Sequence, residues 1–211
     1  MTESQFERRG WRLLGFAWAM HQMNRGYERQ VAVRKRPLFE PLAGTVVEIG
    51  PGTGPNFGYL PRGVRWIGIE PNVHMHPYLK NAAREHGIDV ELRPGLAEAL
   101  PLEDASADAV ISTLVLCSVP NLDGALREIR RVLKPGGRFV FVEHVAAPPG
   151  TWLRRVQGWA GPINAWLGDG CHADRETWRN IEGAGFSKVE LEHARMATDI
   201  ASPHIFGTAF N

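Results

Sequence analysis

The sequence predicts an α/β fold built on a doubly wound, mostly parallel sheet of seven strands with an antiparallel hairpin at its edge. Strand-like and helical segments alternate between residues 44 and 145, which favours parallel strands with helices on both faces. The segment 109–114 is apolar apart from small hydroxyl side chains, as expected of a strand covered on both sides. Two strand-like segments, 186–192 and 203–210, form the final hairpin.

Local signals place the individual elements. Gly87 is well placed to end a helix, Asn121 and Asp123 lie where short polar side chains cap the start of another, and residues 135–137 (Pro-Gly-Gly) predict a turn before a strand. The expected helices cover residues 3–39, 54–60, 74–87, a segment that begins near 121, 151–168 and 175–184, and the expected strands cover residues 46–49, 65–69, 90–93, 109–114, 138–142, 186–192 and 203–210.

The N-terminal region has apolar residues at roughly helical spacing, although Gly10, Gly15 and Gly26 mark candidate breaks. Its segment 11–20 suits either a lid over a ligand site or an amphipathic helix at a membrane interface. The basic residues beside it are few, which favours the lid.

The region 151–168 carries three tryptophans at a spacing of seven, so Trp152, Trp159 and Trp166 share one helical face. Glycines and a proline between them predict that this helix is kinked or split at Gly158, Gly161 and Pro162.

Composition limits the partners. A chain of 211 residues suits one domain, and its 24 basic and 23 acidic side chains provide no overall field for nucleic acid. Two cysteines do not suggest a disulfide framework, and the apolar clusters fall short of the ~20 residues that a spanning helix needs. We expect a cytoplasmic protein with no nucleic-acid partner and no membrane span. Peripheral membrane contact and oligomeric state stay open.

A short apolar strand runs into three glycines at alternate positions, Gly50, Gly52 and Gly54, and the next strand ends on Glu70. Glycines permit backbone angles closed to other residues and let a ligand lie directly on the main chain. A carboxylate at the tip of the second strand can accept hydrogen bonds from both hydroxyl groups of a ribose. The pattern predicts a nucleoside pocket.

The residues in and beside this turn distinguish a dinucleotide from a cationic nucleoside without phosphate. A dinucleotide fingerprint reads G-x-G-x-x-G, but Pro55 occupies the position of its third glycine. Glu48, two positions before the first glycine, would repel a pyrophosphate and attract a cation. S-adenosylmethionine combines a ribose with a positive centre and no phosphate. The alternative is a glycine-rich turn that binds nothing.

With this glycine turn and Glu70, the chain resembles the class I S-adenosylmethionine-dependent methyltransferases. Residues 95–110 look like their adenine-binding loop and fourth strand, and residues 126–137 look like the helix and turn before their fifth strand. The resemblance covers about residues 44–145 and implies a Rossmann-like sheet whose edge matches the final hairpin. It implies one methyltransferase domain over 1–211, with a helical lid (1–40), a cofactor-binding core (44–145) and a substrate-shaping segment with the terminal hairpin (146–211).

The acceptor half is similar to the alkyl thiol methyltransferases of the methyltransferase-like family. The similar strings are residues 113–119 (TLVLCSV), 143–146 (EHVA), 169–171 (DGC) and 203–205 (PHI). This similarity suggests sulfur as the methyl acceptor. Members of that family typically begin with an apolar membrane anchor, and we expect this chain to lack one.

The resemblance also implies site residues. Glu70 would take the ribose hydroxyl groups, whereas Glu98 either contacts the cofactor or only caps a helix. The full set of expected cofactor-binding residues is Glu48, Gly50, Gly52, Gly54, Glu70, Pro71, Asn72, Leu96, Ala97, Glu98, Leu114 and Leu116.

Methyl transfer needs alignment of the two reactants more than covalent help from the protein, and such positioning is worth ~7–11 kcal/mol. If the acceptor is a thiolate, a dry pocket favours the loss of charge in the transition state. We expect the three tryptophans of 151–168 and Phe57 to supply apolar walls. A thiol has a pKa of ~8.5, so a modest shift of that pKa or a nearby base suffices.

His144 is the candidate base, because it follows the fifth strand at the edge of the sheet where ligands bind, and Glu143 would orient it or contact the substrate. The alternative is a histidine that only bonds the backbone. Expected substrate-side residues are Cys171, His172, Trp166 and His204, and His21 is a weaker candidate.

The two cysteines are expected to have different roles. Cys117 is expected to be a small buried apolar side chain, and Cys171 to line the acceptor pocket. No zinc site is expected, because the adjacent pair Cys171-His172 has no second close pair.

Three functions remain in competition: transfer to sulfur of a small apolar thiol, transfer to oxygen, nitrogen or carbon of a phenol, quinone, natural product or phospholipid head group, and a non-catalytic nucleoside-binding module. The retained acceptor-side histidines and tryptophans favour an enzyme over a binding module, and the resemblance to thiol methyltransferases suggests that its acceptor is a thiol.

Overall fold

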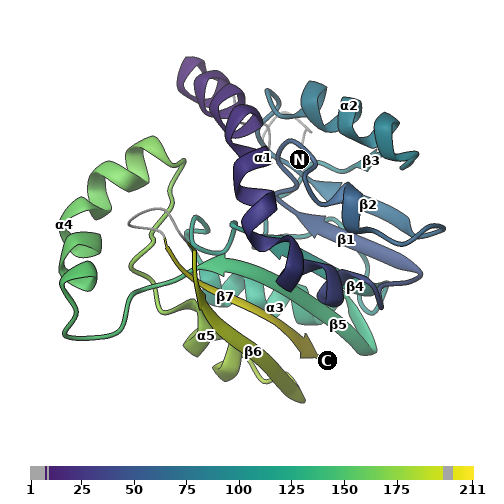
Figure 1. The fold of residues 1–211 in the computed structure, drawn as a ribbon. Coiled ribbons are helices and arrows are strands. Elements are labelled where there is room, and N and C mark those ends of the chain that lie inside the picture. Colours follow the sequence, from purple (N-terminus) through teal and green to yellow (C-terminus); the bar gives the residue numbers. More distant parts are fainter. Residues whose placement is uncertain (1–7, 9, 197–201) are drawn as a thin grey trace.

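A computed structural model describes residues 8, 10–196 and 202–211 of the chain (Figure 1). It contains one seven-stranded sheet in the order β3-β2-β1-β4-β5-β7-β6. The strands are β1 (Thr45–Ile49), β2 (Arg65–Ile69), β3 (Glu91–Leu92), β4 (Ala107–Thr113), β5 (Leu133–His144), β6 (Lys188–Arg195) and β7 (Pro203–Phe210). The helices are α1 (Trp11–Phe39), the short 3-10 turn η2 (Phe57–Tyr59), α2 (His76–His86), α3 (Leu122–Val132), α4 (Trp152–Leu167) and α5 (Thr177–Gly183).

The sheet has the predicted mixture of strand directions. Strands β1 to β5 pair in parallel, and β7 is antiparallel to both β5 and β6. The strand order reverses between β1 and β4, so the crevice at their carboxyl ends is where an open α/β sheet binds ligands. The predicted Rossmann-like fold with an antiparallel edge hairpin is therefore confirmed.

Alternation along the strands builds a core on each face of the sheet. On one face Val110 packs with Leu126 and Ile129 of α3, and with Ile181 of α5. On the other face, Val46, Ala109, Ile111 and Val140 pack against Phe39 near the end of α1. Figure 1 shows α1 in front of the sheet, with α3 and α5 behind it. Burial on both faces explains the continuous apolar character of β4.

The helix at the N-terminus begins directly after Gly10, one of the three candidate breaks, and is continuous at the other two. Helix α1 runs from Trp11 to Phe39 through Gly15 and Gly26 without a break. The part of this prediction that falls on residues 3–7 and 9 lies outside the described residues. Buried side chains such as Val31 and Phe39 fix the second half of α1 on the sheet. This tertiary packing outweighs the intrinsic cost of a glycine in a helix.

Two further local predictions differ from the structure. Helix α4 is one element from Trp152 to Leu167, so it is not split, and the predicted kink stays a prediction. The expected turn at residues 135–137 is an irregularity within β5, where Gly136 has φ +75° and the pairing with β4 shifts register. The hydrogen bonds that satisfy this irregular stretch come from Asn211, whose carbonyl accepts from Gly136 and whose N–H donates to Gly137.

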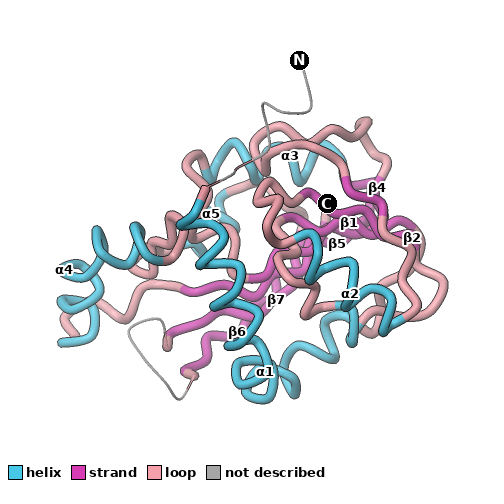
Figure 2. Tube along the Cα trace, turned by 90° about the horizontal axis from the view of Figure 1, so that it is seen from above, coloured by secondary structure: helices cyan, strands magenta, loops and turns pink. Residues whose placement is uncertain are grey.

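Helix α4 projects from the body of the molecule at one end of the sheet (Figures 1 and 2). Its side chains Trp152 and Trp159 are 71% and 83% exposed. No helix in the described part of the chain combines the length and the apolar character that crossing a bilayer requires.

Candidate active site

The turn after β1 has the backbone geometry that its glycines predict. Gly50, Gly52 and Gly54 have φ values of +57°, +56° and +81°. A Cβ at Gly50 would lie 2.6 Å from Val115, and one at Gly54 would lie 2.7 Å from Phe57. A Cβ at Gly52 would meet nothing within 4 Å. The turn is therefore packed from behind at both ends and open in the middle, as a surface for a ligand should be.

Glu70 reaches this open surface from the end of β2. One carboxylate oxygen accepts a hydrogen bond from the N–H of Gly52 at 2.9 Å, and the other accepts from the N–H of Asn72 at 2.8 Å. Each oxygen keeps a second lone pair, which a ribose hydroxyl can use. Burial raises the pKa of Glu70 to about 7, against the opposing effect of these hydrogen bonds. The geometry fits the predicted ribose site.

Glu48 lies beneath the turn and supports it. One of its oxygens accepts from the side-chain amide of Asn56 at 2.6 Å, and the other accepts from the indole N–H of Trp66 at 2.8 Å. The side chain is 1% exposed, and this burial raises its pKa. Both oxygens thus connect the turn to β2, and the predicted attraction for the cationic ligand stays a prediction.

The expected adenine side is formed by two loops. Asn72 is buried and donates from its side-chain amide to the carbonyl of Leu13 at 3.3 Å. In the other loop, Ala97 is buried and Leu96 is 38% exposed. Glu98 accepts from the N–H of Asn121 at 3.2 Å, at the start of α3, and its contact with the cofactor stays a prediction.

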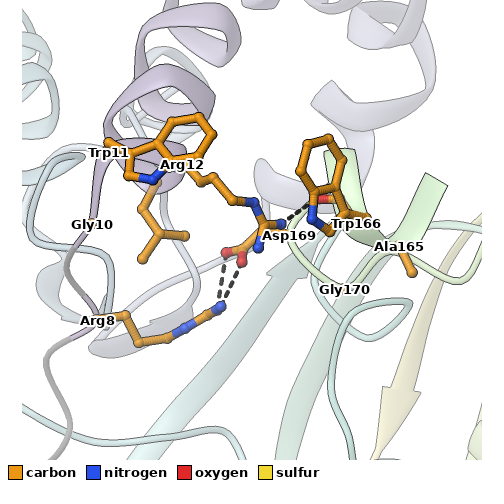
Figure 3. Close-up of a pocket in the computed structure, with 9 residues that line it drawn as sticks. Arg8, Gly10, Trp11, Arg12, Ala165, Trp166, Asp169 and Gly170 are labelled. Atoms are coloured by element: carbon orange, nitrogen blue, oxygen red, sulfur yellow. Dashed lines mark hydrogen bonds and ion pairs between the residues drawn. The ribbon is translucent and has the colours of Figure 1, made fainter. Parts of the chain in front are cut away.

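A lid-like contact joins the segment before α1 to the loop after α4. Arg8 donates to both carboxylate oxygens of Asp169, at 2.9 and 2.5 Å (Figure 3). The backbone N–H of Arg8 donates to the carbonyl of Pro71 at 2.6 Å. Arg12 donates to the carbonyl of Trp166 and lies 4.7 Å above its ring. These residues line a cleft of about 690 Å³ beside the adenosine side of the site. Whether this contact forms a lid over the cofactor stays a prediction.

The acceptor side lies where β4 and β5 end. The Sγ of Cys171 is 3.5 Å from the Sγ of Cys117 and 3.7 Å from Nδ1 of His144. The rings of His144 and His204 meet edge to face with centroids 4.6 Å apart, because β5 and β7 pair these two residues directly. Residues distant in sequence thus form one cluster of sulfur and imidazole groups.

Several buried polar atoms border this cluster without a hydrogen-bond partner in the described structure: the hydroxyl of Tyr27, Oε2 of Glu143 and Nε2 of His204. The other oxygen of Glu143 accepts from Ser112 Oγ at 2.6 Å. Burial raises the pKa of Glu143 to about 7, and burial lowers that of His204 to about 4. His204 is therefore neutral at physiological pH, and these buried polar atoms remain available to contact a ligand.

Comparisons with known proteins agree with this geometry. Residues 47–141 match the family model described as a methyltransferase domain. Human thiol S-methyltransferase TMT1A is 41% identical over 196 residues, which cover 87% of this chain and 80% of that protein. Human thiol S-methyltransferase TMT1B is 36% identical over 208 residues, which cover 92% and 85%. The chain belongs to the thiol S-methyltransferase family.

Solved structures share the fold of this thiol S-methyltransferase family member. One is a putative methyltransferase of Haloferax volcanii in complex with its Trm112 activator, with a TM-score of 0.67 and 18% identity, covering 97% of this chain and 99% of that one. Another is a geranyl diphosphate C-methyltransferase of Streptomyces coelicolor with S-adenosylhomocysteine, with a TM-score of 0.65, 18% identity, and coverage of 87% and 81%. The protein is an S-adenosylmethionine-dependent methyltransferase.

The structure of this family member brings several predicted acceptor residues together and separates others. His144, Cys171 and His204 form the cluster, with Glu143 beside it. His172 points elsewhere, with its ring 3.9 Å from Asp174. Trp166 lies under the guanidinium of Arg12, His21 stacks on Tyr78 at 4.5 Å, and Leu116 packs in the core. The contacts of Leu114 and Leu116 with the cofactor remain predictions.

The expected apolar walls are wrong for most of the aromatic residues named. Trp152 and Trp159 face solvent because α4 projects from the body. Phe57 is buried edge-on against Trp66 at 5.0 Å, beneath the glycine turn. Periodicity showed that the tryptophans share a face, but periodicity does not show what that face covers.

Sequence reasoning missed three contributors. Arg8 and Tyr27 reach the site only through the path of the N-terminal region, and no local pattern marks them. Cys117 was correctly expected to be buried, and it is fully so, but its sulfur faces Cys171. The only available signal was the position of Cys117 just after β4, at the ligand-binding edge of the sheet.

Proposed function

We propose that this enzyme transfers the methyl group of S-adenosylmethionine to the sulfur of a small, fairly apolar thiol. The similarity to TMT1A and TMT1B over most of the chain carries the proposal. The cluster of thiol and imidazole groups at the ends of β4 and β5 supports it, since this is the end of the sheet at which the methyl acceptor must meet the cofactor.

The residues divide into a cofactor side and an acceptor side. The open backbone at Gly52 and the carboxylate of Glu70 hold the adenosine part, and the contact between Arg8 and Asp169 covers it. The bound cofactor supplies a methyl group on a cationic sulfur. Enclosure by the lid excludes water and aligns the two reactants, which is where most of the rate enhancement arises.

The acceptor thiol must lose its proton. With a pKa of ~8.5, only a few per cent of a free thiol is ionised at neutral pH. His144 is the group placed to take this proton, since its ring lies between Cys171 and the neutral His204. Glu143 lies beside it at the end of β5, with one buried oxygen that has no partner in the described structure.

The test is a competition among acceptors. The purified full chain is incubated with methyl-labelled S-adenosylmethionine and a mixed panel of alkyl thiols, aryl thiols, phenols and amines, and each product is identified by mass spectrometry. Label on thiols alone supports the proposal. Label on phenols, quinones or amines but not on thiols would replace it with transfer to oxygen, carbon or nitrogen.

A further inference from the structure

Three possible metal ligands converge at the acceptor side from separate parts of the chain. They are the sulfur of Cys117 after β4, a ring nitrogen of His144 at the end of β5, and the sulfur of Cys171 after α4, and these atoms all lie within 4.8 Å of one another. The two sulfur atoms are 3.5 Å apart, and the Cys171 sulfur is 3.7 Å from Nδ1 of His144.

These distances match the edges of a zinc coordination tetrahedron. With Zn–S bonds of ~2.3 Å and Zn–N bonds of ~2.0–2.1 Å, two sulfur ligands lie about 3.8 Å apart and a sulfur and a nitrogen about 3.6 Å apart. Two of the three edges are already close to these lengths. Two thiolates and one imidazole are also the ligand types that favour zinc over magnesium or calcium.

The surroundings of the cluster point to a ligand as well. Glu143 and His204 are both buried, and each keeps one polar atom without a partner in the described structure. The Cys117 thiol is fully buried beside the sulfur of Cys171. A bound dication deprotonates a coordinating thiol.

We propose that Cys117, His144 and Cys171 bind one zinc ion whose fourth coordination position takes the acceptor thiol. The proposal rests on thiol methylation being the function, and it adds the means of activating the acceptor. Three protein ligands with one open position are typical of catalytic rather than structural zinc. Cys171 and His144 are partly exposed, so the open position has access from the solvent side.

The chemical step balances with zinc as a Lewis acid and no redox change. The acceptor thiol gives its proton to solvent and binds the metal as a thiolate. A lone pair of that sulfur forms the new bond to the methyl carbon, while the bond from this carbon to the cationic sulfur of the cofactor breaks and its electrons stay on that sulfur. The products are a neutral thioether, which no longer carries the charge that held it, and S-adenosylhomocysteine.

This arrangement gives His144 a different task from that of a base. As a metal ligand it holds the zinc, and the metal rather than the imidazole makes the acceptor nucleophilic. The edge-on ring of His204 fixes the orientation of His144, in the way that neighbouring groups orient metal-binding histidines. A zinc site also explains why the sulfur atoms of two cysteines lie together at a site whose reaction needs no cysteine nucleophile.

The first measurement is metal content. The full chain is produced with zinc in the medium, and zinc per chain is counted by mass spectrometry for the wild type, Cys171→Ser and the adjacent control His172→Ala. We expect about one zinc per chain in the wild type and in His172→Ala. Cys171→Ser should bind zinc more weakly than the wild type. The loss of zinc affinity should exceed the ~10- to 100-fold that loss of an outer-shell partner costs. S-adenosylhomocysteine affinity, measured by calorimetry, should change less than about twofold, which shows that Cys171→Ser is folded.

The second measurement probes the open position. Cobalt replaces zinc, and the absorption of the cobalt centre is recorded before and after addition of an alkyl thiol without cofactor. A thiol-dependent change in the spectrum supports a vacant position, and its absence overturns that part of the proposal. Removal of zinc with a chelator should lower thiol methylation at least about tenfold, and added zinc should restore it.

Several results would overturn the zinc site. A wild-type protein without zinc, a Cys171→Ser variant that keeps zinc, or a disulfide between Cys117 and Cys171 in the active enzyme would each rule it out. Thiol methylation that survives complete removal of zinc overturns the zinc role and leaves the proposed function standing. Zinc at the site with methylation of phenols alone would instead refute the thiol function and, with it, the acceptor position.

Discussion

Glu70 shows how one buried carboxylate couples ligand binding to pH. Burial raises its pKa to about 7, above the value of ~4.3 expected for an unfolded chain. Its contribution to the stability of the ligand-free protein is therefore fully present below the unfolded pKa and is lost as pH rises through about 7. Ribose hydroxyl groups donate hydrogen bonds to the ionised carboxylate. Cofactor binding therefore favours the ionised form of Glu70, whereas the ligand-free protein favours the protonated form.

We therefore predict that cofactor affinity falls as pH is lowered through about 7, by up to about tenfold per pH unit below it. Calorimetry with S-adenosylhomocysteine at several pH values measures the effect. Glu70→Gln, which cannot ionise, should bind more weakly at pH 8 and lack this part of the pH dependence. Because both proteins bind the same ligand, titration of the ligand itself cancels. Parallel pH profiles for the two proteins would refute the assignment.

Glu48 carries a different prediction, because its two hydrogen bonds lie inside the scaffold. Glu48→Ala leaves the buried donors of Asn56 and Trp66 without this acceptor. At ~1–3 kcal/mol for each unsatisfied group, we expect the free energy of unfolding to fall by about 2–4 kcal/mol. Urea denaturation gives the value, with Glu190→Ala as the control, since the surface pair of Glu190 with Lys188 is worth less than about 1 kcal/mol. Equal effects of the two substitutions would contradict this role.

At the scale of elements, the predicted lid depends on a contact between two segments 161 positions apart. Arg8 and Asp169 have side-chain exposures of 48% and 18%, so their ion pair is worth only about 1 kcal/mol. We propose that this contact closes the predicted lid over the cofactor and is weak enough to open for cofactor exchange.

We predict that Arg8→Ala weakens cofactor binding by up to about fivefold and acts mainly by raising the dissociation rate. Stopped-flow displacement of bound S-adenosylhomocysteine measures that rate. Arg34→Ala is the matched control, because it removes an exposed ion pair with Glu192 on the same N-terminal helical region. A dissociation rate that Arg8→Ala leaves unchanged would show that this contact does not cover the cofactor.

For the whole molecule, cofactor binding should raise thermal stability. At a ligand concentration of ~100 times Kd the gain is ~2.7 kcal/mol, which corresponds to about 5–10 °C in Tm for a domain of this size. Differential scanning calorimetry with S-adenosylhomocysteine should show this shift, and the same concentration of NAD should show none. A larger shift with NAD would restore the dinucleotide interpretation of the glycine turn.

Most of the fold followed from local sequence signals, because alternation of apolar strands with helices and the position of the glycine turn are local properties. The cofactor side followed for the same reason, since Gly52 and Glu70 are fixed by the first two strands. The acceptor side did not, because Cys117, His144 and Cys171 lie 27 and 54 positions from one another and meet only in the folded sheet. The prediction of a turn at Gly136 was wrong because the hydrogen bonds of this stretch come from Asn211, which is distant in sequence, and not from neighbouring residues.

Hydrogen bonds made by Asn211 hold the register of the whole of β7. The side-chain amide of Asn211 donates to the carbonyls of Arg130 and Leu133, which anchors this end of the strand, while His204 stands at the opposite end facing His144. Sliding β7 by a single position would turn His204 to the other side of the sheet, because neighbouring strand residues point in opposite directions. The position of His204 at one end of β7 is therefore secured by the hydrogen bonds of Asn211 at the other end, roughly 24 Å away at ~3.4 Å per residue.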